Sequence, residues 1–252
     1  MNFKYLFLTF LAVGLISCKQ ESHLYKIEGK LLPITDTIAA NQAIEDFITP
    51  FKESLEKNMS TPLSYAVDTY TKKDGEHNTA IGNMMADAVY EEANPIFNTR
   101  TGENIDFVIL NHGGIRSILP KGVVTTKTAY EIMPFENSIV VTSLKGAQVK
   151  EMFEYLAKAN RPHPVHGFKL TLSPDDNIAS VTTKNNTPID YKKNYFVATN
   201  DYLYNGGDHM NFFKTNDSLY VLDYKIRNAL IDYFTKKDTI NPVIDDRFTQ
   251  LK

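Results

Sequence analysis

The sequence predicts a mixed α/β fold of the α+β kind, in which a mixed β-sheet is flanked by helices. Short runs of β-branched and aromatic residues alternate with segments whose apolar residues recur at helical spacing. This alternation has no steady βαβ rhythm, so an all-parallel sheet is not expected. The chain of 252 residues is 42% hydrophobic and 23% charged, an ordinary globular balance that fits a single domain.

The first predicted elements are a tether and a long helix. Residues 18–35 are mostly polar and are expected to form a tether with a short strand at its end, and residues 36–252 are expected to form the domain. Thr35 or Asp36 can cap a helix that runs to about Asn58. Pro50 lies inside this segment and predicts a kink or a break there.

The later elements are justified by the same two patterns. Runs of four to eight apolar, β-rich residues predict strands, and apolar residues three and four apart predict helices. Strands are therefore expected over 63–70, 105–110, 138–144, 168–172, 178–183 and 195–199, and helices over 79–92, 145–159 and 224–234.

Residues 1–17 have the pattern of a secretion signal rather than of a folded element. Lys4 precedes an apolar run of about a dozen residues, which is shorter than the ~20 that a membrane span needs. The run ends in Leu15-Ile16-Ser17-Cys18, which resembles the lipobox of bacterial lipoproteins. We therefore expect lipidation at Cys18, which would anchor the protein in the bacterial cell envelope, facing the periplasm or the surface. The alternative is an ordinary signal followed by an incidental cysteine.

Charge and cysteine content exclude several classes of function. The chain has 27 Lys and Arg against 30 Asp and Glu, so binding to a nucleic-acid polymer is disfavoured. The only cysteine is Cys18, which excludes an intramolecular disulfide and a cysteine-cluster metal site. His163 and His166 are a weak metal candidate, because Pro162 and Pro164 prevent the helix that would align them.

Three loops combine glycine, proline or polar side chains directly beside predicted strands. The first is 111–116, where Gly113 and Gly114 allow a sharp turn and Arg116 offers a fork for phosphate or carboxylate. A tight turn whose arginine pairs with a nearby acid explains this loop equally well. The second is 133–137, in which Phe135 would ordinarily be a core residue and Asn137 a turn residue.

The third loop is 199–208, where a predicted strand leads into Gly206-Gly207-Asp208. A carboxylate in this place can accept hydrogen bonds from sugar hydroxyls. An Asx-turn or a helix cap at Asp208 explains the pattern equally well.

These loops belong to a longer resemblance. In order and spacing, five segments closely resemble the C-terminal domain of the 5′-nucleotidase / UDP-sugar hydrolase family, over about residues 74–213. The segments are the Gly-Asn-x-x-Ala-Asp-Ala helix at 82–88, Asn-x-Gly-Gly-Ile-Arg at 111–116, Pro-Phe-x-Asn at 134–137, Leu-x-Gly at 144–146 and the final loop at 200–208. The resemblance implies the fold of that domain.

The resemblance also implies roles in binding the base and the sugar. Phe135 and Tyr202 correspond to two aromatic rings that sandwich the base, and Asn137 to an amide at the base edge. Asp208 corresponds to the acid that holds the ribose hydroxyls. Because stacking tolerates any base, little base selectivity is expected.

Further roles are implied for the phosphate end. Arg116 corresponds to an arginine that contacts the phosphates, with Asn111 beside it, and Gly167 to a backbone contact. Family members often carry another phosphate-binding arginine where this chain has Lys72 and Lys73, and a lysine there would act as a point charge.

The family's enzymes begin with a metallophosphatase domain whose metal-binding stretches are not found in this sequence. The resemblance therefore suggests no cofactor or metal in this chain, and no catalytic residue. It suggests the nucleotide-binding half of a split 5′-nucleotidase, with divalent metals held by a separate metallophosphatase chain. Two alternatives remain open: a non-catalytic lipoprotein that binds nucleotides or nucleosides, and an interaction domain with a decayed site.

Overall fold

The computed structural model describes residues 23–159 and 161–252. The chain divides into two units, one up to Thr49 and one from Pro50 to Lys252. The signal peptide expected at 1–17 and the lipidation expected at Cys18 lie outside the described residues. None of the described helices combines the length and the apolar character that crossing a membrane requires.

The first unit differs from the sequence prediction. In the described part of 18–35 the expected short strand is not formed, because residues 23–35 have neither helical nor strand structure and Leu24, Tyr25 and Ile27 are exposed. Without a neighbouring strand to pair with, an apolar triplet has no ladder to join.

The first described helix, α2, covers Gln42–Met59 and so begins later than predicted. Its start is capped by Asn41, whose side-chain oxygen accepts hydrogen bonds from the backbone N–H groups of Ala43 and Ile44. The helix continues past Pro50, so the proline does not end it.

The central sheet of the second unit has the strand order β5-β2-β8-β4-β9. These strands are Val165–His166, Phe107–Ile109, Asn194–Asn200, Ser138–Lys145 and Ser218–Lys225. β2 and β8 run parallel, and the other neighbours are antiparallel, so the predicted mixed sheet is confirmed. Consequently the ends of β2 and β8 and the start of β4 lie at one edge.

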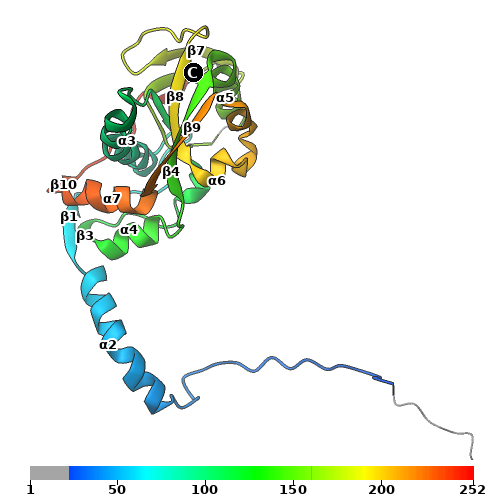
Figure 1. Cartoon of the computed structure of the whole chain (residues 1–252), viewed down its shortest axis with the longest axis vertical. Coiled ribbons are helices and arrows are strands. Elements are labelled where there is room, and N and C mark those ends of the chain that lie inside the picture. The colour runs from blue at the N-terminus through cyan, green and yellow to red at the C-terminus, as the bar shows by residue number, and fades with distance from the viewer. Residues whose placement is uncertain (1–22, 160) are drawn as a thin grey trace, which may run out of the picture. The chain divides into compact units, whose positions relative to one another are not determined.

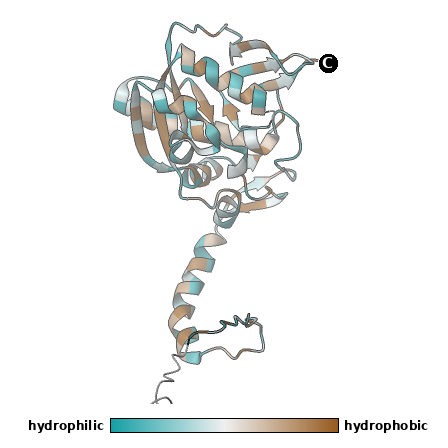
Figure 2. Ribbon diagram, turned by 90° about the vertical axis from the view of Figure 1, so that its right-hand side faces the viewer, coloured by the Kyte–Doolittle hydropathy of each residue, from teal (hydrophilic) through white to brown (hydrophobic). Residues whose placement is uncertain are grey.

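Helices cover both faces of this sheet (Figure 1). On one face α3 (Ala80–Thr101) packs with α7 (Ile226–Thr235), and Val108, Val141 and Ala198 point into that layer. On the other face α5 (Gly146–Ala159) covers alternate strand residues, among them Ile109, Leu144 and Val197. Period-two alternation thus gives the sheet two apolar cores, and Figure 2 shows hydrophobic residues on the strands between the helical layers.

Two small sheets complete the unit. One has the order β10-β1-β3 and the other β11-β6-β7, and each combines parallel and antiparallel pairs. The strands are β1 (Pro62–Ala66), β3 (Gly122–Thr125), β6 (Phe168–Leu172), β7 (Ile178–Thr183), β10 (Thr239–Ile240) and β11 (Phe248–Gln250). The remaining helices are α4 (Thr126–Ile132), α6 (Asp201–Tyr204), η1 (His112–Gly114), η2 (Gly207–His209) and η3 (Asn211–Thr215).

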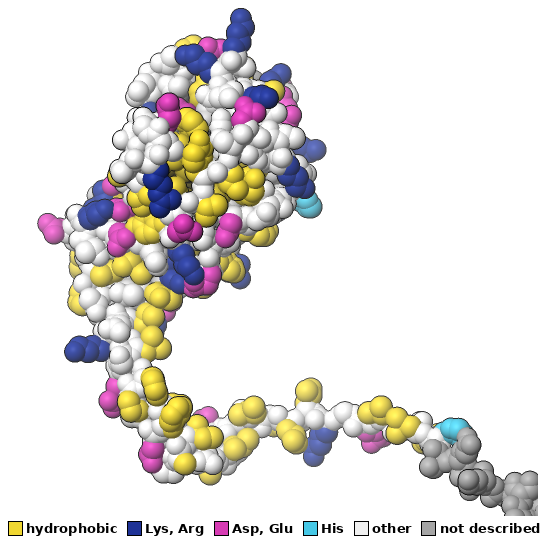
Figure 3. All heavy atoms as spheres, in the orientation of Figure 1, with side chains coloured by type: hydrophobic (Ala, Val, Ile, Leu, Met, Phe, Trp, Pro, Cys, Tyr) yellow, Lys and Arg dark blue, Asp and Glu magenta, His cyan; other side chains and the backbone are white. Residues whose placement is uncertain are grey.

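The surface of the second unit carries charges of both signs. Figure 3 shows acidic and basic side chains interspersed on one face, with hydrophobic side chains between them. This mixture fits the nearly balanced composition of the chain.

Candidate functional site

The three loops singled out from the sequence meet at one edge of the central sheet. The loop after β2 begins at Asn111, the loop before β4 ends at Asn137, and the loop after β8 begins at Asp201. Asn200 Nδ2 donates to Asn111 Oδ1 at 3.2 Å, and Asn137 Nδ2 donates to Asp201 Oδ1 at 2.9 Å. The edge lies at the carboxyl ends of the parallel strands β2 and β8, where open α/β sheets commonly bind ligands.

A cavity of about 380 Å³ opens between these loops, and we call it the slot. Its volume falls within the ~300–1,000 Å³ range of small-molecule sites. Five residues predicted for the site line it together with Gly113: Asn111, Phe135, Asn137, Tyr202 and Asp208. Segments separated by as many as 97 positions (208 − 111) thus share one small cavity.

Phe135 forms one wall of the slot and is not a core residue. Its side chain is 42% exposed. Arg227, at the start of α7 and only 5% exposed, donates to the backbone carbonyls of Pro134 at 3.3 Å and Phe135 at 3.5 Å. Ile226 N–H donates to the Asn137 carbonyl at 3.1 Å. The loop that carries Phe135 is therefore held by a helix far away in the sequence.

Glu136, beside Phe135, strengthens this attachment. Its carboxylate accepts hydrogen bonds from Lys225 and Arg227. These two cations lower the pKa of Glu136 to about 2. The Arg227 guanidinium also lies 4.0 Å from the centroid of the Tyr130 ring. Sequence reasoning missed Arg227, since nothing local in Lys225-Ile226-Arg227 indicates a contact with residues 134–136.

Tyr202 and Asp208 form the other wall. The Tyr202 hydroxyl donates to Asp208 Oδ1 at 2.9 Å and accepts from the Asp208 N–H at 3.3 Å. The Tyr202 ring packs directly on Gly207, where an added Cβ would lie 2.5 Å from the ring. Only a glycine at position 207 allows the ring to lie there, so the Tyr202 ring is held by contacts within its own loop.

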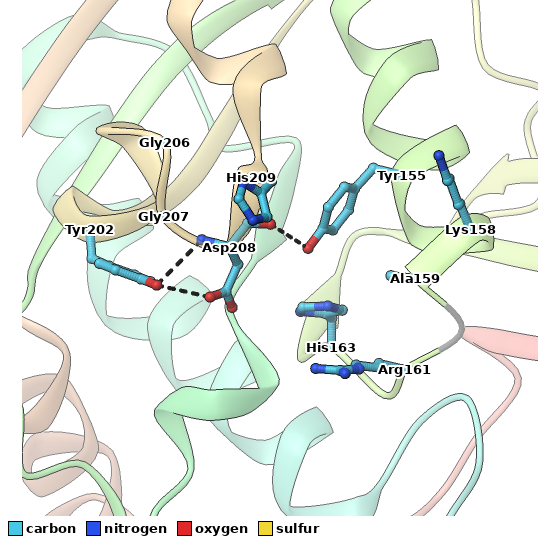
Figure 4. Close-up of a pocket in the computed structure, with 10 residues that line it drawn as sticks. All are labelled: Tyr155, Lys158, Ala159, Arg161, His163, Tyr202, Gly206, Gly207, Asp208 and His209. Atoms are coloured by element: carbon cyan, nitrogen blue, oxygen red, sulfur yellow. Dashed lines mark hydrogen bonds between the residues drawn. The ribbon is translucent and has the colours of Figure 1, made fainter.

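Asp208 has an unusual backbone. Its φ of +48° and the φ of +61° at His209 lie in the left-handed region, which non-glycine residues adopt at a cost. The Tyr155 hydroxyl, from α5, donates to the Asp208 carbonyl at 2.9 Å (Figure 4). Two tyrosine hydroxyls therefore fix the residue that the sequence predicted as an acceptor of sugar hydroxyls. Tyr155 was not foreseen, because it is an ordinary helix residue in the sequence.

Arg116 lies outside the lining of the slot. Its guanidinium carbon is 5.7 Å from the centroid of the Phe135 ring, and within the described residues its side chain forms no ion pair. The alternative of an arginine paired with a nearby acid is therefore not realised there. Lys72 reaches the same loop, since its Nζ donates to the Ile115 carbonyl at 2.9 Å. Two cations thus flank the loop at 111–116.

Gly167 is not brought to the slot. It lies between β5 and β6 against Asp106, which precedes β2, whereas the slot lies beyond the other end of β2. An added Cβ at Gly167 would lie 2.1 Å from the Asp106 carbonyl oxygen, and its φ is +95°. The backbone conformation and the close approach of Asp106 therefore explain why a glycine is needed at position 167, without any contact to a ligand.

His112, in the loop at 111–116, contacts His163. The His112 N–H donates to His163 Nδ1 at 3.3 Å, and His163 Nδ1 also lies 3.1 Å from the Leu110 carbonyl oxygen. Burial lowers the pKa of both imidazoles, so the neutral forms are favoured. His166 contacts Asp87 at 2.7 Å instead. Within the described ranges no three His, Cys, Asp or Glu side chains gather as they would around a metal ion.

A larger cavity of about 850 Å³, which we call the hollow, shares Tyr202 and Asp208 with the slot (Figure 4). Its other lining residues include Tyr155, Arg161 and His163.

Chemically, the slot offers aromatic faces, an amide and a carboxylate, which suit a flat ring attached to a polyhydroxylated group.

Comparisons with known proteins identify the family of the chain. Residues 58–215 match the family described as 5′-nucleotidase, C-terminal domain. The chain is 31% identical to the cell wall protein Lmo0130 of Listeria monocytogenes, over 78% of this chain and 27% of that protein. It is 25% identical to the trifunctional nucleotide phosphoesterase protein YfkN of Bacillus subtilis, over 88% of this chain and 16% of that protein.

Solved structures share the fold. A 5′-nucleotidase precursor from Thermus thermophilus superposes with a TM-score of 0.69 at 19% identity, over 84% of this chain and 43% of that one. The NAD nucleotidase of Haemophilus influenzae gives 0.63, also at 19% identity, over 84% and 42%. This chain therefore spans less than half the length of each of these four proteins.

Proposed function

Because this chain belongs to the 5′-nucleotidase C-terminal domain family, we propose that it binds nucleotides in the slot. The base stacks between Phe135 and Tyr202, the Asn137 side chain meets the base edge, and Asp208 accepts hydrogen bonds from the ribose hydroxyls. Stacking of a base on an aromatic side chain contributes about 1–3 kcal/mol and tolerates any base.

The observation that carries this proposal is the convergence of three loops on one cavity. Phe135 and Tyr202 are both nearly half exposed although they are large aromatic residues. Each is held in place by hydrogen bonds of its own loop or of a neighbouring helix. Exposed aromatic side chains that are held in this way present their faces to a ligand.

The phosphate end of the ligand would lie at the loop 111–116. Arg116 supplies a planar fork and Lys72 a second positive charge beside it. Lys72 thereby takes the place in which family members often carry an arginine. Gly167 has no part in this proposal, since the structure does not bring it to the slot.

Hydrolysis would be supplied by a separate metallophosphatase chain that holds the divalent metals. The described residues contain no group of side chains suited to a two-metal centre. In this proposal the present chain contributes binding and orientation, which place the phosphate ester against the partner's metals.

We place the protein in the cell envelope, anchored through a lipid on Cys18. Its relative Lmo0130 is a cell wall protein, which supports a place outside the cytoplasm. The lipobox-like tetrapeptide at 15–18 supports the anchor.

Calorimetric titration of the purified protein with adenosine and AMP tests the binding proposal. Phe135→Ala should weaken both ligands by about 1–3 kcal/mol. Tyr191→Ala is the matched control, because Tyr191 is 43% exposed and lies outside the slot. Arg116→Ala should weaken AMP much more than adenosine. Absence of binding heat for both ligands, with folded protein, would refute the proposal and leave the interaction-domain alternative.

A second experiment tests the split enzyme. The full-length protein is used to capture envelope proteins of its own cell, and the captured fraction is assayed for AMP hydrolysis with Mn²⁺ or Mg²⁺. We expect turnover only in the combined fraction. Robust turnover by the protein alone would overturn the division of labour, and binding without any hydrolysing partner would favour the non-catalytic binding lipoprotein.

A further inference from the structure

The hollow has a chemistry different from that of the slot. It is lined by Tyr155, Arg161, His163 and His209, together with the wall of Tyr202 and Asp208 that it shares with the slot. Figure 4 shows Arg161 and His163 next to each other in that view, among the residues that line the hollow with Asp208. Among the described residues that line the hollow, Asp208 is the one that carries a carboxylate.

Arg161 stands out among the arginines of this chain. Arg227 and Arg247 form ion pairs with carboxylates, and Arg100 donates to two backbone carbonyls. Within the described residues, the guanidinium of Arg161 forms neither an ion pair nor a hydrogen bond, and Arg116 alone resembles it in this respect. A guanidinium with unused donors beside a cavity has the geometry that recognises phosphate.

Lys158 adds a second positive charge at the rim of the hollow. It lies in the last turn of α5, where a lysine also favours the helix dipole. That explanation does not extend to Arg161, because Arg161 lies beyond the end of the helix.

We propose that the hollow is an anion subsite in which Arg161 binds a phosphate group carried on the 2′/3′ edge of the ribose. The inference rests on the proposed function, which places that edge against Asp208. Tyr202 and Asp208 line both cavities, so in this proposal a substituent on these hydroxyls lies next to the hollow. The ligand class is a nucleoside with a 2′- or 3′-phosphate, and the volume of the hollow leaves room for a group esterified to that phosphate.

The test compares the affinities of adenosine, 3′-AMP and 5′-AMP for the full protein. We expect 3′-AMP to bind about tenfold more tightly than adenosine, which is the scale of a charge-assisted hydrogen bond. Arg161→Ala should remove this difference and leave adenosine binding unchanged. Arg161→Lys should restore part of it, because the charge remains without the fork.

Lys150→Ala is the matched control. Lys150 lies on α5, pairs with Glu154 at 3.8 Å and does not line the hollow, so its removal changes the net charge and one surface ion pair but leaves the lining of the hollow intact. It should leave all three affinities unchanged.

Two results would overturn the inference. In one, 3′-AMP binds no more tightly than adenosine. In the other, the loss on Arg161→Ala falls on 5′-AMP, which would assign this arginine to the 5′-phosphate. The proposed function is tested separately, by adenosine: Arg161-dependent binding of 3′-AMP without adenosine binding would support the anion subsite and refute the stacking slot.

Discussion

The two aromatic walls of the slot are supported in opposite ways. The Phe135 wall depends on side chains from the start of α7, about 90 residues away in the sequence, chiefly Arg227. The Tyr202 ring is held by its own loop, through the bonds between Tyr202 and Asp208 and the packing on Gly207, and another element supports this wall through the Tyr155 hydroxyl on the Asp208 backbone. The Phe135 wall can therefore be disturbed from a distance, whereas the position of the Tyr202 ring responds chiefly to changes within a few residues.

This difference gives each wall its own experimental signature. Loss of the remote support should lower both the stability of the fold and the affinity for the ligand. Arg227 is buried in the fold and also holds the loop that carries Phe135. Loss of a local support should lower affinity with little change in stability, because Tyr202 is nearly half exposed.

The largest effect is expected from Arg227→Met. This change leaves the carbonyls of Pro134 and Phe135 without their donor and should lower the free energy of unfolding by about 1–3 kcal/mol. Adenosine binding should weaken as well, because Phe135 loses its support. Urea unfolding and titration calorimetry measure the two quantities.

Arg100→Met is the control for this variant. Arg100 donates to the carbonyls of Val221 and Leu222, at 3.0 and 3.2 Å, and takes no part in the slot. It should alter stability without altering adenosine affinity. If Arg227→Met also leaves the affinity unchanged, the Phe135 wall does not depend on α7.

The next effect is expected from Tyr202→Ala. Removal of the ring should cost about 1–3 kcal/mol of binding free energy, whereas the unfolding free energy should change little because the ring is 46% exposed. A marked drop in stability would show that Tyr202 serves the fold rather than the ligand.

A smaller effect is expected from Tyr202→Phe, which keeps the ring and removes only the hydroxyl that donates to Asp208. Adenosine should bind about 0.5–1.5 kcal/mol more weakly, the usual value of one hydrogen bond. Dideoxyadenosine, without ribose hydroxyls, should bind equally well to both proteins. Equal losses for the two ligands would show that the hydroxyl does not act through the ribose.

The smallest effect concerns pH. Burial lowers the pKa of His163 below the ordinary 6.5, so the unfolded chain takes up protons more readily. The contribution of neutral His163 to the free energy of unfolding is therefore fully present above about pH 6.5 and is lost as the pH falls below that value. Glu136, with its pKa at about 2, keeps its charge in that range, so the Phe135 wall should not respond.

Urea unfolding at pH 7.5 and pH 5.5 measures this dependence. His163→Asn should make the dependence weaker. A dependence that is equally steep in the variant would assign it to other groups.

Local patterns predicted most of the central fold. The bounds of β6 and β7 agree with the sequence prediction, because alternating residues of β6 are buried. β9 was not predicted, since Leu219 and Val221 face solvent and only Leu222 is well buried. α3 was predicted to end at Glu92 but continues to Thr101, where Gly102 in the left-handed conformation ends it.

The site was predicted in part, for a similar reason. Loops that follow strands carry readable residue types, so Asn111, Phe135 and Asp208 could be found before their positions were known. Arg227, Tyr155 and Arg161 lie on or just beyond helices, and only the tertiary fold brings them to these loops. No residue type or spacing in their own segments signals the contact.

The pairing of β4 with β8 extends over seven residue pairs, from Ile139 with Asn200 to Lys145 with Asn194. Because the loops of Phe135 and Tyr202 are attached to one end of this ladder, the ladder fixes the points at which the two loops leave the sheet. We therefore expect that residues 133–137 and 201–209 can be exchanged together between homologues without changing the pairing of β4 and β8. Chimaeras built in this way would transfer ligand preference, and exchange of one loop alone would mismatch the gap between the two loops.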